Sequence, residues 1–354
     1  MSKRKLTVVA TSPSPPPPLK KKRKTAAKRP VTYEIAPVPS LTTTYRGRLG
    51  YACLNTVLRH QAPASSAVFC SRTCRIATLA KEGIAFAKNL GLQNARDLIT
   101  LIKWNAQHGI RFMRVSSDMF PFASHPVWGY DLAYANDVLA EAGNLANSLG
   151  HRLTTHPGQF TQLGSPNDKV IQASIRELTY HAEMLDRMRQ GPDAVMIIHG
   201  GGVYGDKHAA LARIRNSITT RLPAHVRARL VLENDELCYS AADLLPLCEE
   251  LDVPLVFDYH HHDINPGYIS APTPPNDNEA ASADTAADTS PRPGALTIPE
   301  RRAHADRVAR LPEVIWDDVD LMIEAKDKEQ AVLQLYRTYG LAGVDGLGAV
   351  DGGE

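Results

Sequence analysis

Seven short apolar runs, separated by stretches with helical patterning, constrain the fold of this 354-residue chain more than any other feature. They are rich in aliphatic and β-branched residues, as strands buried on both faces are. The runs occupy residues 48–55, 110–117, 151–158, 194–202, 228–235, 253–260 and 320–326. Because no glycine-rich phosphate-binding motif follows the first run, we predict an α/β fold of the TIM (β/α)8 type rather than a doubly wound sheet.

The helical patterns between the runs carry recognisable boundaries. One begins after Ser165, with Pro166 in its opening turn, and ends before Gly191, as capped helices do. Another covers residues 240–252. Helices that join continuous apolar runs are typical of parallel strands.

Five of the runs end on side chains that bind metals, namely His156, His199, Glu233, Asp258 and Glu324. In a closed barrel the carboxyl ends of the strands meet at one mouth, where such enzymes keep their active sites. Imidazole and carboxylate groups without thiolate suit Mn²⁺, Zn²⁺ or Mg²⁺. Five ligands are more than one tetrahedral ion needs, so we predict a cluster of two or three ions, which fits phosphodiester hydrolysis.

The amino-acid composition distinguishes an N-terminal tail from the domain that follows it. Residues 1–43 are rich in proline, serine and lysine, and residues 1–30 carry a charge of +10, which leaves −8 on the rest of this +2 chain. We predict that residues 1–43 are disordered and that PLKKKRK is a nuclear localisation signal read by an import receptor, or an electrostatic DNA-binding tail. Residues 269–295 are predicted to be a disordered insertion in a barrel domain covering 44–342, with a flexible tail at 343–354. No apolar run is long enough to span a membrane.

Eight motifs, in order over roughly residues 44–340, resemble the UV damage endonuclease family of fungal type. They are RGRLGYACLN, FMRVSSDMFPFASH, HPGQF, IIHGGGVYGDK, LENDE, FDYHHH, RRAHADR and DLMIEAKDKEQAV. The resemblance implies a barrel related to endonuclease IV and the xylose isomerases. It implies a hydrolase that initiates excision repair of damaged double-stranded DNA. Such an enzyme nicks immediately 5′ of cyclobutane dimers, 6-4 photoproducts and some other lesions, leaving a 3′-hydroxyl and a 5′-phosphate.

The resemblance also implies a cofactor of two or three Mn²⁺ ions, with Zn²⁺, Co²⁺ or Mg²⁺ as alternatives. We predict a monomeric protein, located in the nucleus because of the basic N-terminal segment, with a mitochondrial pool as a further possibility. Seven metal ligands are implied: His156, His199, Glu233, Asp258, His261, His304 and Glu324. Glu233 would bridge the first metal to the second, and Glu233, Asp258 and Glu324 would act in catalysis through the metals. His261 and His304 would belong to a third metal, while their neighbours His260 and His262 receive no ligand role.

By the same resemblance, Gln159 and Phe160 form a pair that enters the duplex opposite the lesion. Glutamine can hydrogen-bond base edges and an aromatic ring can replace a lost stack. The alternative for Phe160 is a core position beneath the loop. Further DNA or lesion contacts are implied for Tyr51, Asn55, Ser116, Ser117, His125 and Lys326. Barrel-mouth packing for Tyr51, strand-end capping for the serines and a solvated helix start for Lys326 are the alternatives.

One family segment is missing from the sequence. The family has a strand ending in Lys-x-His between FDYHHH and RRAHADR, but no lysine or histidine occurs between Asp263 and His304. We therefore predict that the seventh strand is missing, or replaced by the disordered insertion. Either a gene-model error or deletion removed it, or this barrel closes without it, although a lost strand leaves two unpaired edges. The alternative functions are a noncatalytic damaged-DNA-binding relative and a divalent-metal sugar isomerase.

Overall fold

The fold is built on one parallel β-sheet. The computed structural model describes residues 35, 37–267, 285–287, 301–313 and 318–341. Eight strands pair in the order β6-β5-β4-β3-β2-β1-β8-β7, every pair parallel. They are β1 Leu49–Ala52, β2 Phe112–Val115, β3 Arg152–Thr155, β4 Met196–His199, β5 Leu230–Glu233, β6 Leu255–Val256, β7 Thr285–Ala287 and β8 Leu321–Ile323.

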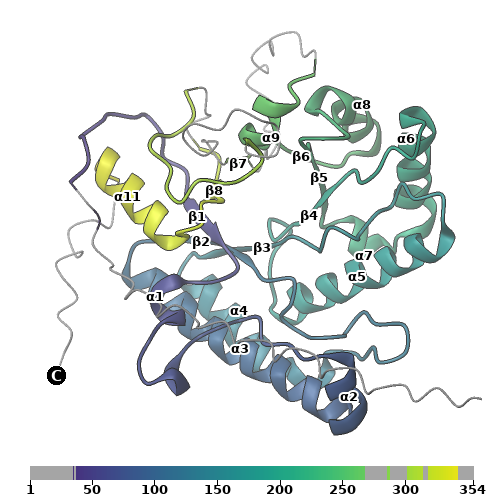
Figure 1. Cartoon of the computed structure of the whole chain (residues 1–354), viewed down its shortest axis with the longest axis horizontal. Coiled ribbons are helices and arrows are strands. Elements are labelled where there is room, and N and C mark those ends of the chain that lie inside the picture. The colour runs from purple at the N-terminus through teal and green to yellow at the C-terminus, as the bar shows by residue number, and fades with distance from the viewer. Residues whose placement is uncertain (1–34, 36, 268–284, 288–300, 314–317, 342–354) are drawn as a thin grey trace, which may run out of the picture. The chain divides into compact units, whose positions relative to one another are not determined.

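Helices connect consecutive strands and surround the sheet (Figure 1). The α-helices are α1 Thr56–Arg59, α2 Ile76–Glu82, α3 Ile84–Gln107, α4 Asn136–Ser148, α5 Asp168–Arg187, α6 Lys207–Asn216, α7 Ala224–Arg227, α8 Ala241–Leu251, α9 Tyr259–Ile264 and α11 Glu329–Tyr339. The described residues also contain two short 3₁₀ helices, Ala64–Ser66 and Ala133–Ala135, and one π-helical turn, Ser217–Arg221. None of the helices in the described ranges is long and apolar enough to cross a membrane.

The predicted TIM-like α/β fold is confirmed. Strands β1 to β6 and β8 lie inside the seven predicted apolar runs. The sheet has β6 and β7 at its two ends, and no hydrogen bonds between these two strands occur in the described part of the chain. Within the described residues the strands therefore form a curled but open sheet, which is consistent with the predicted loss of the ligand-bearing strand.

Strand β7 was not expected. It lies within residues 269–295, where sequence reasoning placed a disordered insertion, and it pairs with β8 from Thr285 to Ala287. Ladder hydrogen bonds come from the backbone, so a segment of threonine and alanine forms them without an apolar run. Most of the predicted insertion, like the basic segment of the N-terminal tail and the C-terminal tail, lies outside the described residues.

The helix boundaries follow local capping. The structure corrects the start of α5, because Asn167 rather than Ser165 is its N-cap and accepts a hydrogen bond from the Lys169 backbone N–H at 3.0 Å. Helix α8 begins after Ser240, whose side chain and that of Asp243 form a reciprocal capping box. Each side chain satisfies a backbone N–H that a helix start leaves unpaired.

The strands bury different residues on their two faces. Tyr51, Met113, Ile198 and Leu232 belong to the large core between the sheet and the surrounding helices. A second, smaller apolar cluster lies on the inner face of the curled sheet and consists of Ala52, Phe112, Val195, Ile197, Val231, Val256 and Met322. Side chains alternate along a strand, and six of the strands, β1, β2, β4, β5, β6 and β8, contribute to this inner cluster.

The amino end of the sheet is held by a partly buried ion network. Asp320, just before β8, accepts hydrogen bonds from Arg48 Nη2 at 2.7 Å and from Arg152 Nη1 at 2.9 Å. The network joins the starts of β1, β3 and β8, three strands that are distant in sequence. It lies at the end of the barrel opposite to the metal-ligand candidates.

The part of the predicted tail that the structure describes contacts helix α11. Leu41 N–H donates to the Thr338 carbonyl at 2.8 Å, and Arg337 Nη1 donates to the Ile35 carbonyl at 2.6 Å. These hydrogen bonds attach the chain before residue 44 to the barrel domain, which therefore begins earlier than the composition indicated.

Candidate metal centre

The metal-ligand candidates occupy the inner face of the sheet at the carboxyl ends of its strands. His199 lies two residues beyond Ile197 of the inner cluster, and Glu233 lies two beyond Val231. The same spacing puts Asp258 beyond Val256 and Glu324 beyond Met322, while His156 follows Thr154. Because alternate residues share a face, these five side chains point to one mouth above the apolar interior.

Glu233 lies at the centre of the group. Its Oε2 is 3.0 Å from His156 Nε2 and 3.5 Å from His199 Nε2. These three residues form one group with the spacing of metal ligands, and Glu233, Asp258 and His261 form another, with the ligand atoms of each group within 4.8 Å of one another. Glu233 is shared between the two groups, the position of a bridging carboxylate.

Backbone carbonyls lie within hydrogen-bond distance of Nδ1 in two of the imidazoles and orient them. His156 Nδ1 is 3.1 Å from the Pro157 carbonyl, and His261 Nδ1 is 3.0 Å from the Asn234 carbonyl. When Nδ1 donates its proton to a carbonyl, Nε2 keeps its lone pair for a metal. This is the arrangement that metal-binding histidines usually have.

Asn234 also fixes the position of Asp258. Its Oδ1 accepts from the Asp258 backbone N–H at 2.8 Å, and its Nδ2 donates to the Asp258 carbonyl at 3.0 Å. The Asp258 Oδ1 in turn accepts from His261 N–H at 2.9 Å and caps helix α9. The sequence LENDE thus supplies a candidate ligand, Glu233, and the residue that positions the next one.

Glu233 and Asp258 are buried and Glu324 is half-buried, and the pKa values of the three carboxylates diverge. Burial raises the pKa of Asp258 well above its usual value, and the negative charges of Glu233 and Glu324 raise it further. Burial also acts to raise the pKa of Glu233, but His199 and His156 outweigh it and bring that pKa to about 2. At Glu324, burial is outweighed by Arg114, so its pKa lies below its usual value. The negative charges of these three carboxylates repel one another at a largely buried site, and a cation bound there would relieve that repulsion.

The donor set fits divalent metals. Imidazole nitrogens and carboxylate oxygens in two groups sharing Glu233 are the ligands of borderline and hard divalent ions. His199 Nδ1 is buried without a hydrogen-bond partner among the described residues, and burial lowers the pKa of His199, which favours the neutral, ligating imidazole. These residues could therefore hold metal ions through His156, His199, Glu233, Asp258 and His261.

His304 lies apart from both groups. Its Nε2 is 4.0 Å from Glu324 Oε2, and it lines an open pocket of about 380 Å³ together with Glu236, His261 and Arg302. His260 is buried with its ring centroid 5.3 Å from that of His304, and His262 is half-buried. Neither His260 nor His262 belongs to a metal-ligand group in the described part of the protein.

Three residues near the centre were not found from sequence. Arg114 lies two residues beyond Phe112 on the inner face of β2 and forms an ion pair with Glu324. Glu236 lies 3.6 Å from His261 Nε2 and pairs with Arg302. Asn234 holds Asp258 as described above. Side chains alternate along the strand FMRV, so Arg114 could have been placed at the mouth from the sequence. No sequence pattern predicts that Glu236 contacts Arg302.

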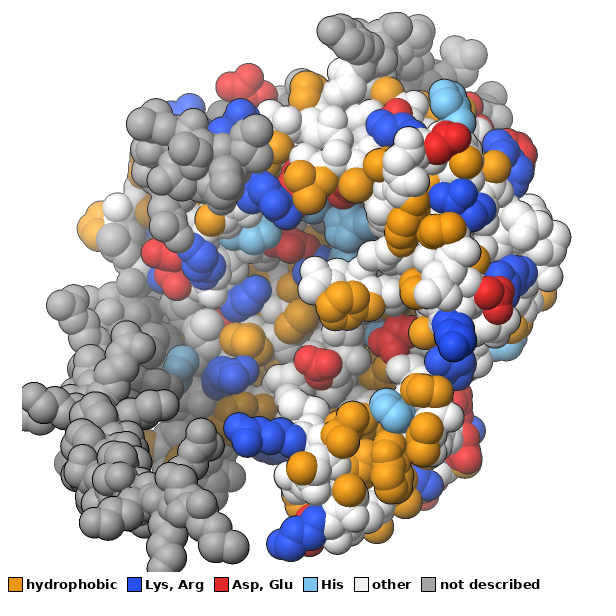
Figure 2. Space-filling model, turned by 45° about the vertical axis from the view of Figure 1, so that its right-hand side comes forward, with side chains coloured by type: hydrophobic (Ala, Val, Ile, Leu, Met, Phe, Trp, Pro, Cys, Tyr) orange, Lys and Arg blue, Asp and Glu red, His pale blue; other side chains and the backbone are white. Residues whose placement is uncertain are grey.

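The predicted DNA-contacting residues separate into exposed and buried sets. Phe160 is 79% exposed in the loop between β3 and α5, and Gln159 beside it is exposed too, which rejects the core interpretation of Phe160. Lys326 is exposed, with Nζ 3.5 Å from Asp306. Figure 2 shows histidine and acidic side chains in a hollow of the surface bordered by lysine and arginine side chains.

The structure argues against the predicted lesion contacts of Tyr51 and Asn55. Both are 1% exposed or less. The Tyr51 hydroxyl donates to Asn105 Oδ1 at 2.6 Å and accepts from Asn55 Nδ2 at 3.1 Å, while Asn55 Oδ1 caps helix α1 through Leu58 N–H. Tyr51 lies on the outer face of β1, so strand parity directs it to the helices and away from the mouth.

The remaining predicted contacts have structural partners. Ser116 is buried and its Oγ accepts from the Asp118 backbone N–H at 3.2 Å. Ser117 is half-buried, and its carbonyl accepts from the Tyr180 hydroxyl at 3.3 Å. His125 is half-buried, and its Nδ1 accepts from Val127 and Trp128 N–H groups at 3.1 Å. The burial of Ser116 favours the strand-end capping interpretation over contact with DNA.

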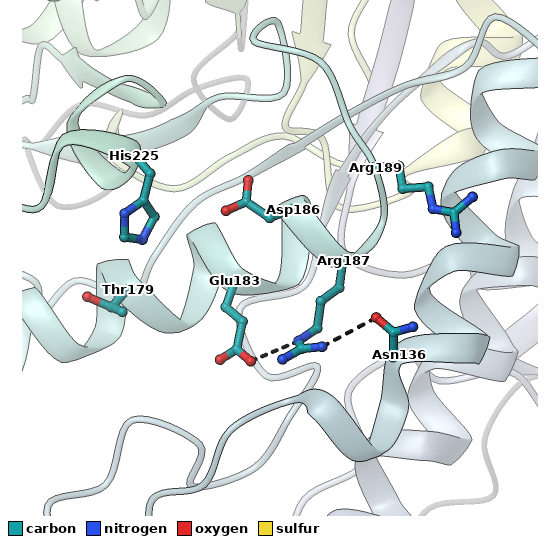
Figure 3. Close-up of a pocket in the computed structure, with 7 residues that line it drawn as sticks. All are labelled: Asn136, Thr179, Glu183, Asp186, Arg187, Arg189 and His225. Atoms are coloured by element: carbon teal, nitrogen blue, oxygen red, sulfur yellow. Dashed lines mark hydrogen bonds and ion pairs between the residues drawn. The ribbon is translucent and has the colours of Figure 1, made fainter.

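A second pocket, of about 450 Å³, lies away from the candidate ligands. Figure 3 shows residues of helices α4 and α5 that line it, with Arg187 between Glu183 and Asn136. Arg187 Nε donates to Glu183 at 2.8 Å, and its Nη1 lies 3.3 Å from Asn136 Oδ1. It contains none of the sequence-predicted site residues.

The fold and the site together define a class: parallel β/α barrel-type proteins with candidate metal ligands at the carboxyl ends of the strands. A model of the UV-endonuclease UvdE family matches residues 47–354. The chain belongs to this family.

Relatives with known names support this assignment. The chain is 49% identical to a UV-damage endonuclease of Schizosaccharomyces pombe over 86% of its length and 46% identical to one of Neurospora crassa over 90%. These alignments cover 52% and 55% of the two fungal proteins, so the chain spans about half the length of these curated relatives. The crystal structure of SacUVDE is 27% identical, with a TM-score of 0.67, over 82% of this chain and 96% of that one.

Proposed function

We propose that this protein is a metal-dependent DNA repair endonuclease that nicks the phosphodiester immediately 5′ of UV photoproducts and some other lesions. The products would be a 3′-hydroxyl and a 5′-phosphate, the starting point of excision repair. The observation that carries the proposal is the convergence of His156, His199, Glu233, Asp258 and His261 at the mouth of a barrel of the UvdE family.

The proposed cofactor is a cluster of two or three divalent ions, with Mn²⁺ as the first candidate and Zn²⁺, Co²⁺ or Mg²⁺ as alternatives. Bound there, such ions would supply an activated water and neutralise the charge that develops on the scissile phosphate. The chain's own contribution is to fix the ligands. Asn234 holds Asp258, and backbone carbonyls lie within hydrogen-bond distance of Nδ1 of His156 and His261 and orient these imidazoles. Glu324, paired with Arg114, would complete the second metal's ligands.

Damaged double-stranded DNA is the proposed substrate. Support comes from Gln159 and Phe160, which stand exposed directly after the strand that delivers His156. An exposed aromatic ring has no stabilising role in the isolated chain, whereas it could stack in the gap that a distorted base pair leaves. Lys326 could contact the backbone. The N-terminal basic segment is proposed to bring the protein to the nucleus through an import receptor, and the protein is proposed to act as a monomer.

The third metal site is the least complete part of the proposal. His261 and His304 were assigned to it, but His304 lies outside both ligand groups, and the Lys-x-His segment is missing from the sequence. A noncatalytic protein that binds damaged DNA is therefore the alternative that the experiment below distinguishes from the enzyme. The sugar isomerase alternative gains no support, since the family relatives are named as endonucleases.

One experiment separates the enzyme from the binding protein. The purified chain is incubated with Mn²⁺ and a duplex that carries one cyclobutane dimer, and the strands are separated on a denaturing gel. We expect one nick immediately 5′ of the dimer, absent with EDTA and with Glu324→Gln. Glu250→Gln is the matched control, because Glu250 is exposed and pairs only with Arg215 in the described structure. Damage-specific binding without a nick would identify a noncatalytic relative, and no preference for the damaged duplex would refute both.

A further inference from the structure

The loop that follows β4 has a geometry that metal binding does not explain. The sequence IIHGGGVYGDK provides His199 to the candidate centre, but Tyr204 lies five residues further on and is 42% exposed. Its φ is +50°, a left-handed conformation that non-glycine residues adopt at a cost. A strained, exposed aromatic side chain at the mouth of a barrel requires a compensating role.

We propose that Tyr204 is a positioning residue that braces the Gln159–Phe160 pair for insertion into damaged DNA; this rests on the proposed function. The Tyr204 hydroxyl donates to Gln162 Oε1. The same amide, through Gln162 Nε2, donates to the Gln159 carbonyl at 3.4 Å. Tyr204 is thereby linked through one side chain to the backbone of the pair.

Two glycines leave room for the contact between the loop of Tyr204 and the loop of Gln162. Gly201 has φ +83°, and a Cβ there would lie 3.2 Å from Gln162 Cγ. A Cβ on Gly202 would lie 3.2 Å from the ring of Tyr204. Both distances are tighter than side chains normally tolerate. The glycines after His199 therefore make room for the two side chains of the brace.

The brace is anchored to helices on both sides. The Gln162 backbone N–H donates to Ser174 Oγ at 2.7 Å, which ties the β3–α5 loop to helix α5. The guanidinium of Arg213 in helix α6 lies 5.8 Å from the Tyr204 ring centroid, and its Nε donates to the Gly164 carbonyl at 2.7 Å. Gly158, just before the pair, contrasts with this in having open space beside it, since a Cβ there would meet nothing within 4 Å.

Holding the pair in place should matter more for damaged than for undamaged DNA. Insertion requires the loop to keep its conformation against the base stack, and a loop already fixed in that conformation loses less entropy on binding. Nonspecific affinity comes from contacts with phosphates and does not require insertion. The brace should therefore act on the preference for damage.

The first test measures the brace without DNA. Hydrogen exchange of the backbone amides of residues 158–163 is compared in the unaltered full chain and in Tyr204→Phe, which keeps the ring and removes only the hydroxyl. We expect exchange in this loop to become about three- to tenfold faster, the equivalent of losing one ordinary hydrogen bond. Tyr134→Phe is the matched control, because it removes one tyrosine hydroxyl whose hydrogen bond, to the Lys88 backbone carbonyl at 3.0 Å, lies outside this loop. Unchanged exchange in Tyr204→Phe would overturn the proposal.

The second test measures insertion. A duplex with one cyclobutane dimer and 2-aminopurine opposite the lesion, titrated in EDTA, reports unstacking as a rise in fluorescence. We expect Tyr204→Phe to reduce both this rise and the ratio of affinities for damaged over undamaged duplex about three- to tenfold, with undamaged binding unchanged. An unaltered ratio would overturn the role in insertion. If the unaltered chain shows no preference for damage while loop exchange still rises in Tyr204→Phe, the brace stands and the proposed function fails.

Discussion

Replacing Asp258 with asparagine should stabilise the metal-free protein while removing much of the stabilisation that metal provides. The ligating oxygens of Asp258 and Glu233 lie within 4.8 Å of each other, and Asp258 is 1% exposed. Two unit charges at that separation repel by about 3.5 kcal/mol at an effective dielectric constant of about 20. Burial and the charges of Glu233 and Glu324 raise the pKa of Asp258, so proton uptake already relieves part of this cost.

The asparagine preserves the local structure while it removes the charge. Its side-chain oxygen can still accept the His261 N–H that Asp258 Oδ1 accepts at 2.9 Å, and asparagine caps helices about as well as aspartate. We therefore expect a gain of about 1–3 kcal/mol without metal, or roughly 3–10 °C in Tm. In the unaltered chain, metal at a hundredfold excess over its Kd should add about 2.7 kcal/mol, and the variant should gain less than half of that.

The assay is thermal unfolding in EDTA and in Mn²⁺ across a range of pH. Because the pKa of Asp258 is raised in the folded state, its ionisation costs stability, and this loss grows as pH rises above the ordinary aspartate value of 3.8. The difference between the two proteins should thus be small in acid and increase with pH. Asp206→Asn is the matched control, since Asp206 is an exposed N-cap that accepts from Ala209 N–H at 2.9 Å. The reasoning is refuted if Asp258→Asn is less stable than the unaltered chain in EDTA and gains as much from Mn²⁺.

Three further outcomes test other parts of the structure. Phe160→Ala should change the free energy of unfolding by less than about 0.5 kcal/mol, because the ring is exposed. In a gel-shift titration it should reduce the binding preference for damaged DNA by about 1–3 kcal/mol, and a preference equal to that of the unaltered chain would contradict insertion. Asp320→Ala should cost about 3–5 kcal/mol in urea unfolding, since it removes the partner of Arg48 and of the buried Arg152; an unchanged midpoint would show that the network is dispensable. Glu233 has a pKa of about 2 against 4.5 for a free glutamate, so its ionised form stabilises the metal-free protein above pH 4.5, and this contribution is lost as pH falls toward 2. Glu233→Gln should accordingly show a flatter dependence of Tm on pH between about 2 and 4.5, and an equal slope would contradict that pKa.

The sequence determined the parts of this protein that depend on local pattern. Continuous apolar runs define strands wherever they occur, so β1 to β6 and β8 were predictable. Five of these runs end on His, Glu or Asp. Because parallel strands bring their carboxyl ends together, this pattern placed the candidate ligands at one mouth. Asn167 capped α5 instead of Ser165, an error of two residues that arose because both side chains can cap a helix.

Tertiary structure decided which neighbours each of these side chains meets. Tyr51 and Phe160 are both aromatic residues close to strand ends, but strand parity buries Tyr51 against the helices while the loop leaves Phe160 exposed. Arg114 reaches Glu324, and Glu236 reaches Arg302, across separations of 210 and 66 residues that no local pattern encodes. Strand β7 forms from Thr-Ala-Ala, because the edge of β8 offers backbone hydrogen-bond partners whatever the side chains of the pairing segment are. Local patterning fixes what an element is, whereas charge pairing, burial and edge contacts depend on where the tertiary structure puts it.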